Sequence, residues 1–121
     1  MKTENQIKGK KGEDAAAEHL EDKGYQILER NWRIGHLEVD IIASNDSFLV
    51  IAEVKTRKSD AFGEPEDFVN LQKQRNLIRA AAVYVERRGI RKEIRFDIIS
   101  VISQDGGFTV RHIEDAFKPR W

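Results

Sequence analysis

Residues 37–57 read LEVDIIASNDSFLVIAEVKTR, which is two apolar runs separated by the polar residues Asn45-Asp46-Ser47. Runs of Val, Ile and Leu that are bounded by turn residues are typical of buried strands. The stretch therefore predicts an antiparallel hairpin in the interior of a sheet. With Asp46 and Ser47 at the centre of the turn, Ile42 faces Ile51.

The predicted register brings charged residues together at the open end of this hairpin. It places Asp40 opposite Glu53 and Glu38 opposite Lys55. Side chains alternate between the faces of a sheet with a period of two, so all four are expected on one face. A shift of one residue in the turn would destroy this arrangement. Charges on buried strands are costly unless they have partners or a function.

The size and composition of the chain predict one compact domain spanning residues 1–121. Apolar residues make up 40% and charged residues 35%, which is enough for a core beneath a highly charged surface. The 21 Lys and Arg residues balance the 21 Asp and Glu residues. Net charge therefore indicates no class of partner, and only local clusters of charge can do so.

The chain has no cysteine, which excludes disulfides, thiolate nucleophiles and cysteine-ligated metal sites. Its longest uncharged run is far too short to span a bilayer, and no signal-peptide core follows the first residues. We therefore expect a cytoplasmic protein that does not bind a membrane.

Two helices are expected on either side of the hairpin. The first covers about residues 5–23, and the glycines at 9 and 12 inside it indicate either close backbone packing or a later start. The second covers about residues 66–87, with Pro65 in its first turn and Gly89 at its end.

Further strands are expected over residues 25–33, 93–103 and 108–113, and a helical turn with a tail over 114–121. The first of these strands carries many charges and is expected at a sheet edge. The helix between the third and fourth strands supplies the crossover that parallel neighbours require. The order α-β-β-β-α-β-β therefore predicts a mixed sheet with helices on both faces.

Asp40, Glu53 and Lys55 have residue types that suit metal-assisted chemistry. The two carboxylates are hard oxygen donors of the kind that bind Mg²⁺. Lys55 is expected on the same face, where it could position or deprotonate a water molecule or neutralise charge on a phosphate. A metal ion would lower the pKa of that water and hold the phosphoryl oxygens. Hydrolysis of phosphodiester bonds is the reaction that this constellation suits best.

Five blocks of sequence resemble the YraN family of small bacterial endonuclease-like proteins: GKKGEDAAAEHL, NWRIGHLEVDIIA, FLVIAEVKTR, FGEPEDFV and RFDIISV. They cover the chain from about Gly9 to Val101. The pattern of Asp40 followed by Glu53-Val54-Lys55 is also similar to the PD-(D/E)XK nuclease superfamily, especially the archaeal Holliday-junction resolvases. One departure is Val39, where the nominal pattern has proline. The resemblance implies a restriction-endonuclease-like three-layer α/β/α sandwich with a mixed central sheet.

The resemblance also implies roles for individual residues. Asp40, Glu53 and the backbone carbonyl of Val54 match the ligands of Mg²⁺ or Mn²⁺. Lys55 matches the catalytic lysine, and Glu13 on the first helix matches the acid that completes the site in resolvase-like members. The implied activity is that of an endonuclease acting on DNA, including branched or structured forms.

Nucleic acid is the implied partner, and a homodimer is the assembly common among resolvase-like relatives. Lys73 lies where related nucleases often keep a polar residue near the scissile phosphate. Lys11, Arg57 and Lys58 belong to local basic clusters that could contact phosphates without reading sequence.

Two other functions remain open. The chain could be a non-catalytic module that holds nucleic acid or a protein partner on a nuclease fold. Alternatively, the acids could form a structural ion-pair cluster, with Glu38 as the partner of Lys55.

Several other residues are expected to have structural roles. Asp97, between two apolar neighbours, is a second candidate for a buried acid and is expected to make structural hydrogen bonds. Trp32 and Trp121 could stack on bases, although packing is the commoner role of tryptophan. The three histidines, His19, His36 and His112, show no ligand spacing and are expected on the surface or in packing.

Overall fold

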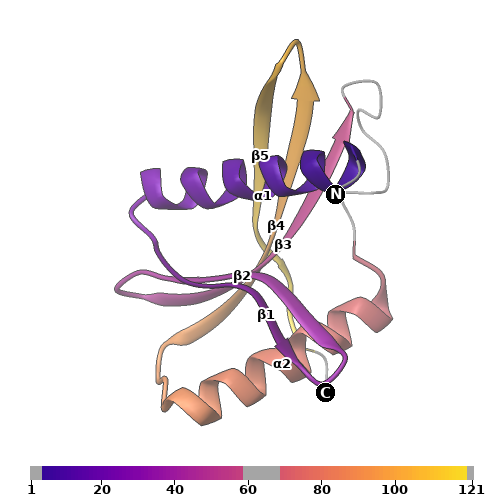
Figure 1. The fold of residues 1–121 in the computed structure, drawn as a ribbon. Helices are drawn as coiled ribbons and strands as arrows, with labels where there is room; N and C mark the ends of the chain where they lie inside the picture. The colour runs from indigo at the N-terminus through magenta and orange to yellow at the C-terminus, as the bar shows by residue number, and fades with distance from the viewer. Residues whose placement is uncertain (1–3, 59–68, 120–121) are drawn as a thin grey trace.

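A mixed five-stranded sheet lies between two helices in the computed structural model, which describes residues 4–58 and 69–119 (Figure 1). The strand order is β1-β2-β3-β4-β5; β3 and β4 run parallel, and the other neighbouring strands run antiparallel. Along the chain the elements are α1 (Glu4–Asp22), β1 (Gln26–Ile34), β2 (Leu37–Ser44), β3 (Phe48–Lys58), α2 (Leu71–Arg88), β4 (Glu93–Gln104) and β5 (Gly107–Phe117). The predicted order and fold class are confirmed, and β1 is an edge strand as expected.

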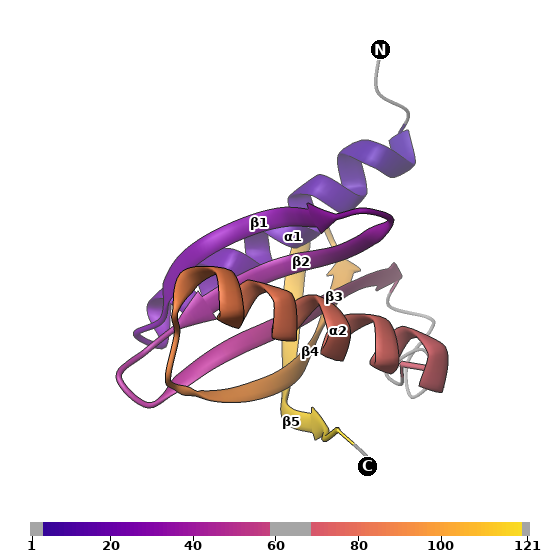
Figure 2. The same cartoon turned by 90° about the horizontal axis from the view of Figure 1, so that it is seen from below.

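The two helices cover opposite faces of the sheet, which separates the core into two clusters. Figure 2 shows α2 in front of the sheet and α1 behind it. The cluster between α1 and the sheet consists of the buried residues Ala16, Ala17, Leu20, Tyr25, Ile41, Ala43, Val50, Ala52, Ile99 and Val101. The cluster between α2 and the sheet consists of Leu37, Val39, Ile42, Leu49, Ile51, Val69, Leu77, Ala80, Ala81, Tyr84, Phe96 and Ile98. None of the helices described is long and apolar enough to cross a membrane.

The turn between β2 and β3 sets the register of the central hairpin. The side-chain oxygen of Asn45 accepts hydrogen bonds from the backbone N–H groups of Ser47 and Phe48 at 3.0 and 2.8 Å. An asparagine that binds the backbone in this way forms a local turn. The predicted pairing of Ile42 with Ile51 is confirmed, within a ladder that runs to Ile41 with Ala52.

Helix α2 begins later than the sequence predicted. Its N-cap is Asn70, whose side-chain oxygen accepts a hydrogen bond from the backbone N–H of Lys73 at 2.8 Å. Such a cap satisfies a donor that the first helical turn leaves unpaired, and it sets where the helix starts. The predicted start near residue 66 and the expected role of Pro65 lie outside the described residues, and Val69 is not helical.

The helical turn expected after residue 113 is wrong, because β5 continues to Phe117. A register shift opposite Asp97 allows Phe117 to pair with Phe96, and their rings stack with centroids 5.0 Å apart. Asp115, at φ 54°, donates its backbone N–H to the Asp97 carboxylate at 3.0 Å. These contacts are made across the sheet, so the local sequence of the tail does not indicate them.

Gly12 allows α1 to pack closely against β3. The helix already begins at Glu4, so the late start considered for the glycine-containing segment is excluded. A Cβ atom added to Gly12 would overlap the hydroxyl oxygen of Thr56. Close packing is therefore the reason for glycine at this position.

Replacement of Gly12 by alanine is expected to lower the free energy of unfolding by about 1–3 kcal/mol, because overpacking outweighs the better helix propensity of alanine. Urea unfolding measures this change. Thr56→Ala removes the overlapping oxygen, so the double variant should recover most of the loss. Equal or greater stability of Gly12→Ala alone would contradict the close packing.

Candidate functional site

Asp40 of β2 and Glu53 of β3 lie together one step beyond the hairpin ladder, which ends at Ile41 and Ala52. The Oδ2 atom of Asp40 accepts a hydrogen bond from the backbone N–H of Val54 at 2.8 Å. Glu53 is 8% exposed, and its Oε1 atom is buried without a hydrogen-bond partner in the described part of the chain. The predicted approach of the two acids is therefore confirmed, and one of their oxygens is left unsatisfied.

The electrostatics of this pair favour an added positive charge. Burial raises the pKa of Asp40 to about 7, and the charge and hydrogen bond of Glu53 act in the same direction. The backbone N–H of Val54 and the charge of Lys73 oppose this increase. At neutral pH the Asp40 carboxyl group therefore carries a proton for part of the time. A divalent cation could replace that proton and satisfy the unpaired oxygen of Glu53.

Two lysines lie on the α2 side of the pair. The Nζ atom of Lys73, in the first turn of α2, is 3.6 Å from Oε2 of Glu53. Lys55 follows Glu53 by two residues in β3, so its half-buried side chain leaves the strand on the same face. Among residues 4–58 and 69–119, no carboxylate lies within ion-pairing distance of the Lys55 ammonium. Of these two lysines, Lys73 is the one that forms an ion pair with Glu53.

Glu13 is held next to the pair but not in it. Its Oε1 atom accepts hydrogen bonds from Nε of Arg30 at 3.1 Å and from Nδ2 of Asn31 at 2.9 Å. The register of β1 with β2 places Asn31, at φ 52°, opposite Asp40. Within the described chain, no three His, Cys, Asp or Glu side chains are grouped so that they could hold a metal ion. The structure thus brings two of the three predicted acids into contact, and the third, Glu13, binds the β1 residue that lies opposite Asp40 in the register.

Glu38 does not pair with Lys55, and this prediction is wrong. Its Oε2 atom is 2.8 Å from Nε of Arg33 on β1. The ladder of β2 with β3 ends at Ile41 and Ala52. Leu37 and Val39, before this point, pack in the α2-side core, whereas Ile41 and Ala43 pack in the α1-side core. This change of side at Asp40 interrupts the alternation that the prediction assumed, and it separates Glu38 from Asp40.

The residues predicted to contact phosphates occupy different surroundings. Lys73 lies at the acid pair, and Lys11 is exposed on α1. Arg57 is half-buried on β3, on the same face as Glu53 and Lys55 by strand alternation. Lys58 ends β3, and its side chain lies outside the described part of the structure.

The two tryptophans also differ. Trp32 packs against the α2-side core, and its ring meets that of Tyr84 edge to face, with centroids 5.1 Å apart. Its expected packing role is confirmed. Trp121 lies outside the described residues.

The sequence did not indicate a hydrogen-bond network on the α1 side of the sheet. Asp97 is fully buried and accepts hydrogen bonds from Arg95, from His112 and from the backbone of Asp115. His112 in turn contacts His19 at 3.1 Å. The expected structural role of Asp97 is supported by these contacts. The pairing of the histidines could not be found from spacing, because 93 residues separate them.

Comparison with known proteins shows close relatives along nearly the whole chain. The family described as "Uncharacterised protein family UPF0102" matches residues 12–101. A UPF0102 protein of Bacteroides thetaiotaomicron is 49% identical over 92% of this chain and 92% of its own length. A UPF0102 protein of Flavobacterium psychrophilum is 50% identical over 90% of this chain and 92% of its own.

Among solved structures, Pyrococcus furiosus SfsA in complex with Ca²⁺ is similar with a TM-score of 0.39 and 14% identity. The match covers 91% of this chain and 63% of SfsA.

Proposed function

We propose that this chain, which belongs to the UPF0102 (YraN) family, is a metal-dependent nuclease that hydrolyses phosphodiester bonds in DNA, including branched or structured forms. One observation carries the proposal. The half-buried carboxyl group of Asp40 and the buried one of Glu53 share a site in which an oxygen of Glu53 has no partner among the described residues. Such a site is costly for the fold unless a cation occupies it.

The donor atoms at this site fit Mg²⁺ or Mn²⁺. Both ions prefer carboxylate oxygens, and Mg²⁺ is commonly held by one or two carboxylates, with substrate phosphate and water completing its ligands. Asp40 and Glu53 would hold the ion, with the backbone carbonyl of Val54 as a further ligand. When bound, the ion would lower the pKa of a water molecule and stabilise negative charge on the phosphate.

The protein residues would supply positioning and proton transfer. Lys55 would hold the attacking water, or its neutral amine would take the proton of that water and become an ammonium; the ammonium would then neutralise charge on the phosphate. Lys73 lies within ion-pairing distance of Glu53 and would contact a phosphate oxygen once the ion neutralises the pair. Arg30 and Asn31 fix Glu13 beside this edge, from which its carboxylate would support the metal or the nucleophile.

Cleavage of a panel of plasmid, duplex and branched DNA in Mg²⁺ or Mn²⁺ tests the proposal. Metal-dependent nicking is expected, and Lys55→Ala should reduce its rate by about 10²–10⁴-fold, the usual contribution of a positioned acid or base. The melting temperature should change little.

Lys92→Ala is a matched control, because Lys92 binds the carbonyl of Asn45 at the turn end of the hairpin, away from the acid pair. It should cleave at the wild-type rate. If neither metal supports cleavage of any substrate while nucleic-acid binding survives Lys55→Ala, the chain is a binding module and the nuclease proposal fails.

A further inference from the structure

A cavity of about 430 Å³ lies between the first half of α2 and the residues that follow β5. Its apolar lining comes from Leu71, Ile78 and Pro119, and its charged lining is entirely positive. The cations are Arg75, Arg79 and Lys118. Its volume falls in the range of about 300–1,000 Å³ that is typical of ligand sites.

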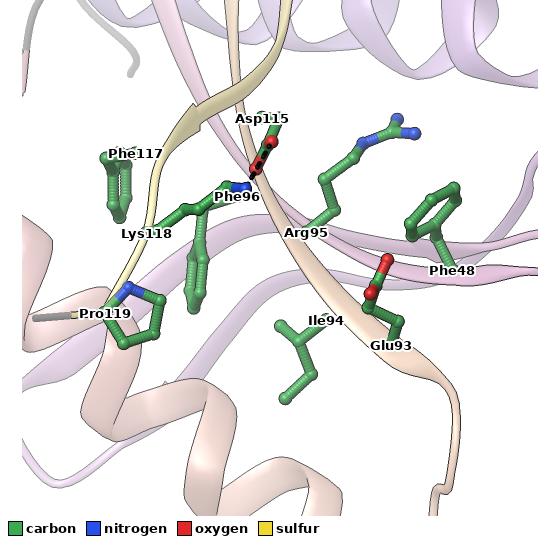
Figure 3. Close-up of a pocket in the computed structure, with 9 residues that line it drawn as sticks. All are labelled: Phe48, Glu93, Ile94, Arg95, Phe96, Asp115, Phe117, Lys118 and Pro119. Atoms are coloured by element: carbon green, nitrogen blue, oxygen red, sulfur yellow. Dashed lines mark ion pairs between the residues drawn. The ribbon is translucent and has the colours of Figure 1, made fainter.

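The two arginines of this cavity, Arg75 and Arg79, have no carboxylate partner among residues 4–58 and 69–119. Arg75 and Arg79 are exposed, and neither forms an ion pair with another residue in the described ranges. Lys118 is already paired, because its Nζ atom is 3.5 Å from Oδ2 of Asp115 (Figure 3). The cavity therefore presents two guanidinium groups that no described residue neutralises, and these favour an anionic ligand.

A neighbouring cavity that shares Lys118 and Pro119 differs in charge. Figure 3 shows this second cavity, of about 360 Å³, with the carboxylates of Glu93 and Asp115 among its lining. The guanidinium group of Arg95, which also lines it, is occupied by Asp97 and by the hydroxyl of Tyr25. Mixed charge does not select an anion, so of these two cavities the one beside α2 is better suited to an anion.

The apolar lining favours an anion that also has apolar surfaces. Leu71 is 52% exposed and is the large apolar side chain most open to solvent among the described residues. An unpaired nucleotide presents flat apolar faces beside a charged phosphate, whereas a duplex keeps its bases stacked inside. Bases would lie on Leu71, Ile78 and Pro119 while phosphates contact Arg75 and Arg79. Arginine planes can also stack on bases.

We propose that this cavity, which is separate from the pair of Asp40 and Glu53, binds a single-stranded segment of nucleic acid. This proposal rests on the proposed function, which identifies the anion as nucleic acid. The same two turns of α2 carry Leu71 and Arg75 at the cavity and Lys73 at Glu53. An unpaired strand held here would place the adjoining duplex or branch beside the acids, which suits a structured substrate.

Fluorescence anisotropy with a labelled thymidine 15-mer and a duplex of equal length tests this site. Measurements are made in EDTA, so that neither metal nor cleavage contributes. The double variant Arg75→Gln/Arg79→Gln should lose about 10-fold or more in single-strand affinity and lower the salt slope by about one to two units. Leu71→Ser should weaken single-strand binding without changing that slope.

The double variant Arg87→Gln/Arg91→Gln is the matched control, because it removes two exposed arginines at the other end of α2. It should change single-strand affinity less than about 3-fold if contact with the cavity matters more than overall charge. Circular dichroism and the melting temperature establish that each variant is folded.

The proposal is overturned if the two double variants weaken single-strand binding equally. It is also overturned if Arg75→Gln/Arg79→Gln lowers duplex affinity as much as single-strand affinity. A rise in affinity after deletion of residues 120–121 would also overturn it, because the end of the chain would then be the occupant. If the wild type binds the single strand through the cavity but cleaves no substrate, the nuclease function alone is refuted. If it cleaves DNA but the cavity variants bind the single strand as tightly as the wild type, the cavity site alone is refuted.

Discussion

Replacement of Asp40 by asparagine is expected to abolish metal-dependent cleavage while making the metal-free protein more stable. Asparagine is a neutral mimic of the protonated acid: its oxygen can still accept from the N–H of Val54, and its amide can donate to Glu53. Loss of a ligand should remove several kcal/mol of transition-state stabilisation, or about 10³-fold or more in rate. Gain of stability together with loss of activity distinguishes a functional acid from a structural one.

The stability gain should depend on pH in a defined direction. The pKa of Asp40 is raised to about 7, so the folded protein disfavours the ionised carboxylate. In the unfolded chain this group ionises at about pH 4, so its contribution to stability falls as the pH rises from about 4 to 7. Asp40→Asn removes this loss. Its advantage should be small at pH 4.5 and about 2–4 kcal/mol at pH 8 in EDTA.

Urea unfolding at both pH values measures this difference. Glu38→Gln is a suitable control, because Glu38 is a carboxylate of the same strand but pairs with Arg33 at the surface. It should change the free energy of unfolding by less than about 1 kcal/mol. Addition of Mg²⁺ at pH 8 should raise the melting temperature of the wild type and not that of Asp40→Asn. Equal metal stabilisation of both proteins would show that the ion binds elsewhere.

Replacement of Asp97 by asparagine is expected to cost about 3–5 kcal/mol of folding free energy, because it leaves the Arg95 guanidinium without its buried counter-ion. Asp97 is fully buried, and Nε and one terminal nitrogen of Arg95 lie 2.9 and 2.8 Å from its two oxygens. Chemical unfolding measures the loss. Glu114→Gln, which changes an exposed carboxylate 3.8 Å from Arg95, should cost less than about 1 kcal/mol.

The same carboxylate makes stability depend on pH at the acid end. Burial raises the pKa of Asp97, but hydrogen bonds from His112, Arg95 and the backbone of Asp115 outweigh burial and leave the pKa below its usual value. A lowered pKa contributes stability that is complete above about pH 4 and is lost as the pH falls through the folded value. Wild type should therefore lose stability below pH 4 more steeply than Asp97→Asn. Parallel profiles would contradict this role.

Structural features could be predicted from local sequence where the contacts that determine them join residues close together in the chain. Asn45 binds the backbone two and three residues away, so the turn and the pairing of Ile42 with Ile51 could be predicted. Helix α1 ends near Gly24, as expected from that residue. The predicted start of α2 differs from the observed one by a few residues. The side chain of Asn70 caps the helix by binding the backbone, and asparagine favours such a cap over a position inside the helix.

Contacts across the sheet could not be predicted in the same way. The tail was expected to be helical, yet Phe117 pairs with Phe96 because the bulge opposite Asp97 extends β5. His19 and His112 meet from α1 and β5, and no spacing rule connects them. Glu38 was assigned the wrong partner because alternation was assumed along the whole of β2.

The order of the elements and the approach of Asp40 to Glu53 follow from local sequence, because turn chemistry and strand alternation act over a few residues. Only the tertiary structure decided which other charges reach that pair. The change of side at Asp40 directs Glu38 to β1, α2 supplies Lys73 from one face, and β1 holds Glu13 at the edge. Those positions depend on how helices pack on a twisted sheet, and packing angles are set by side chains distant in sequence.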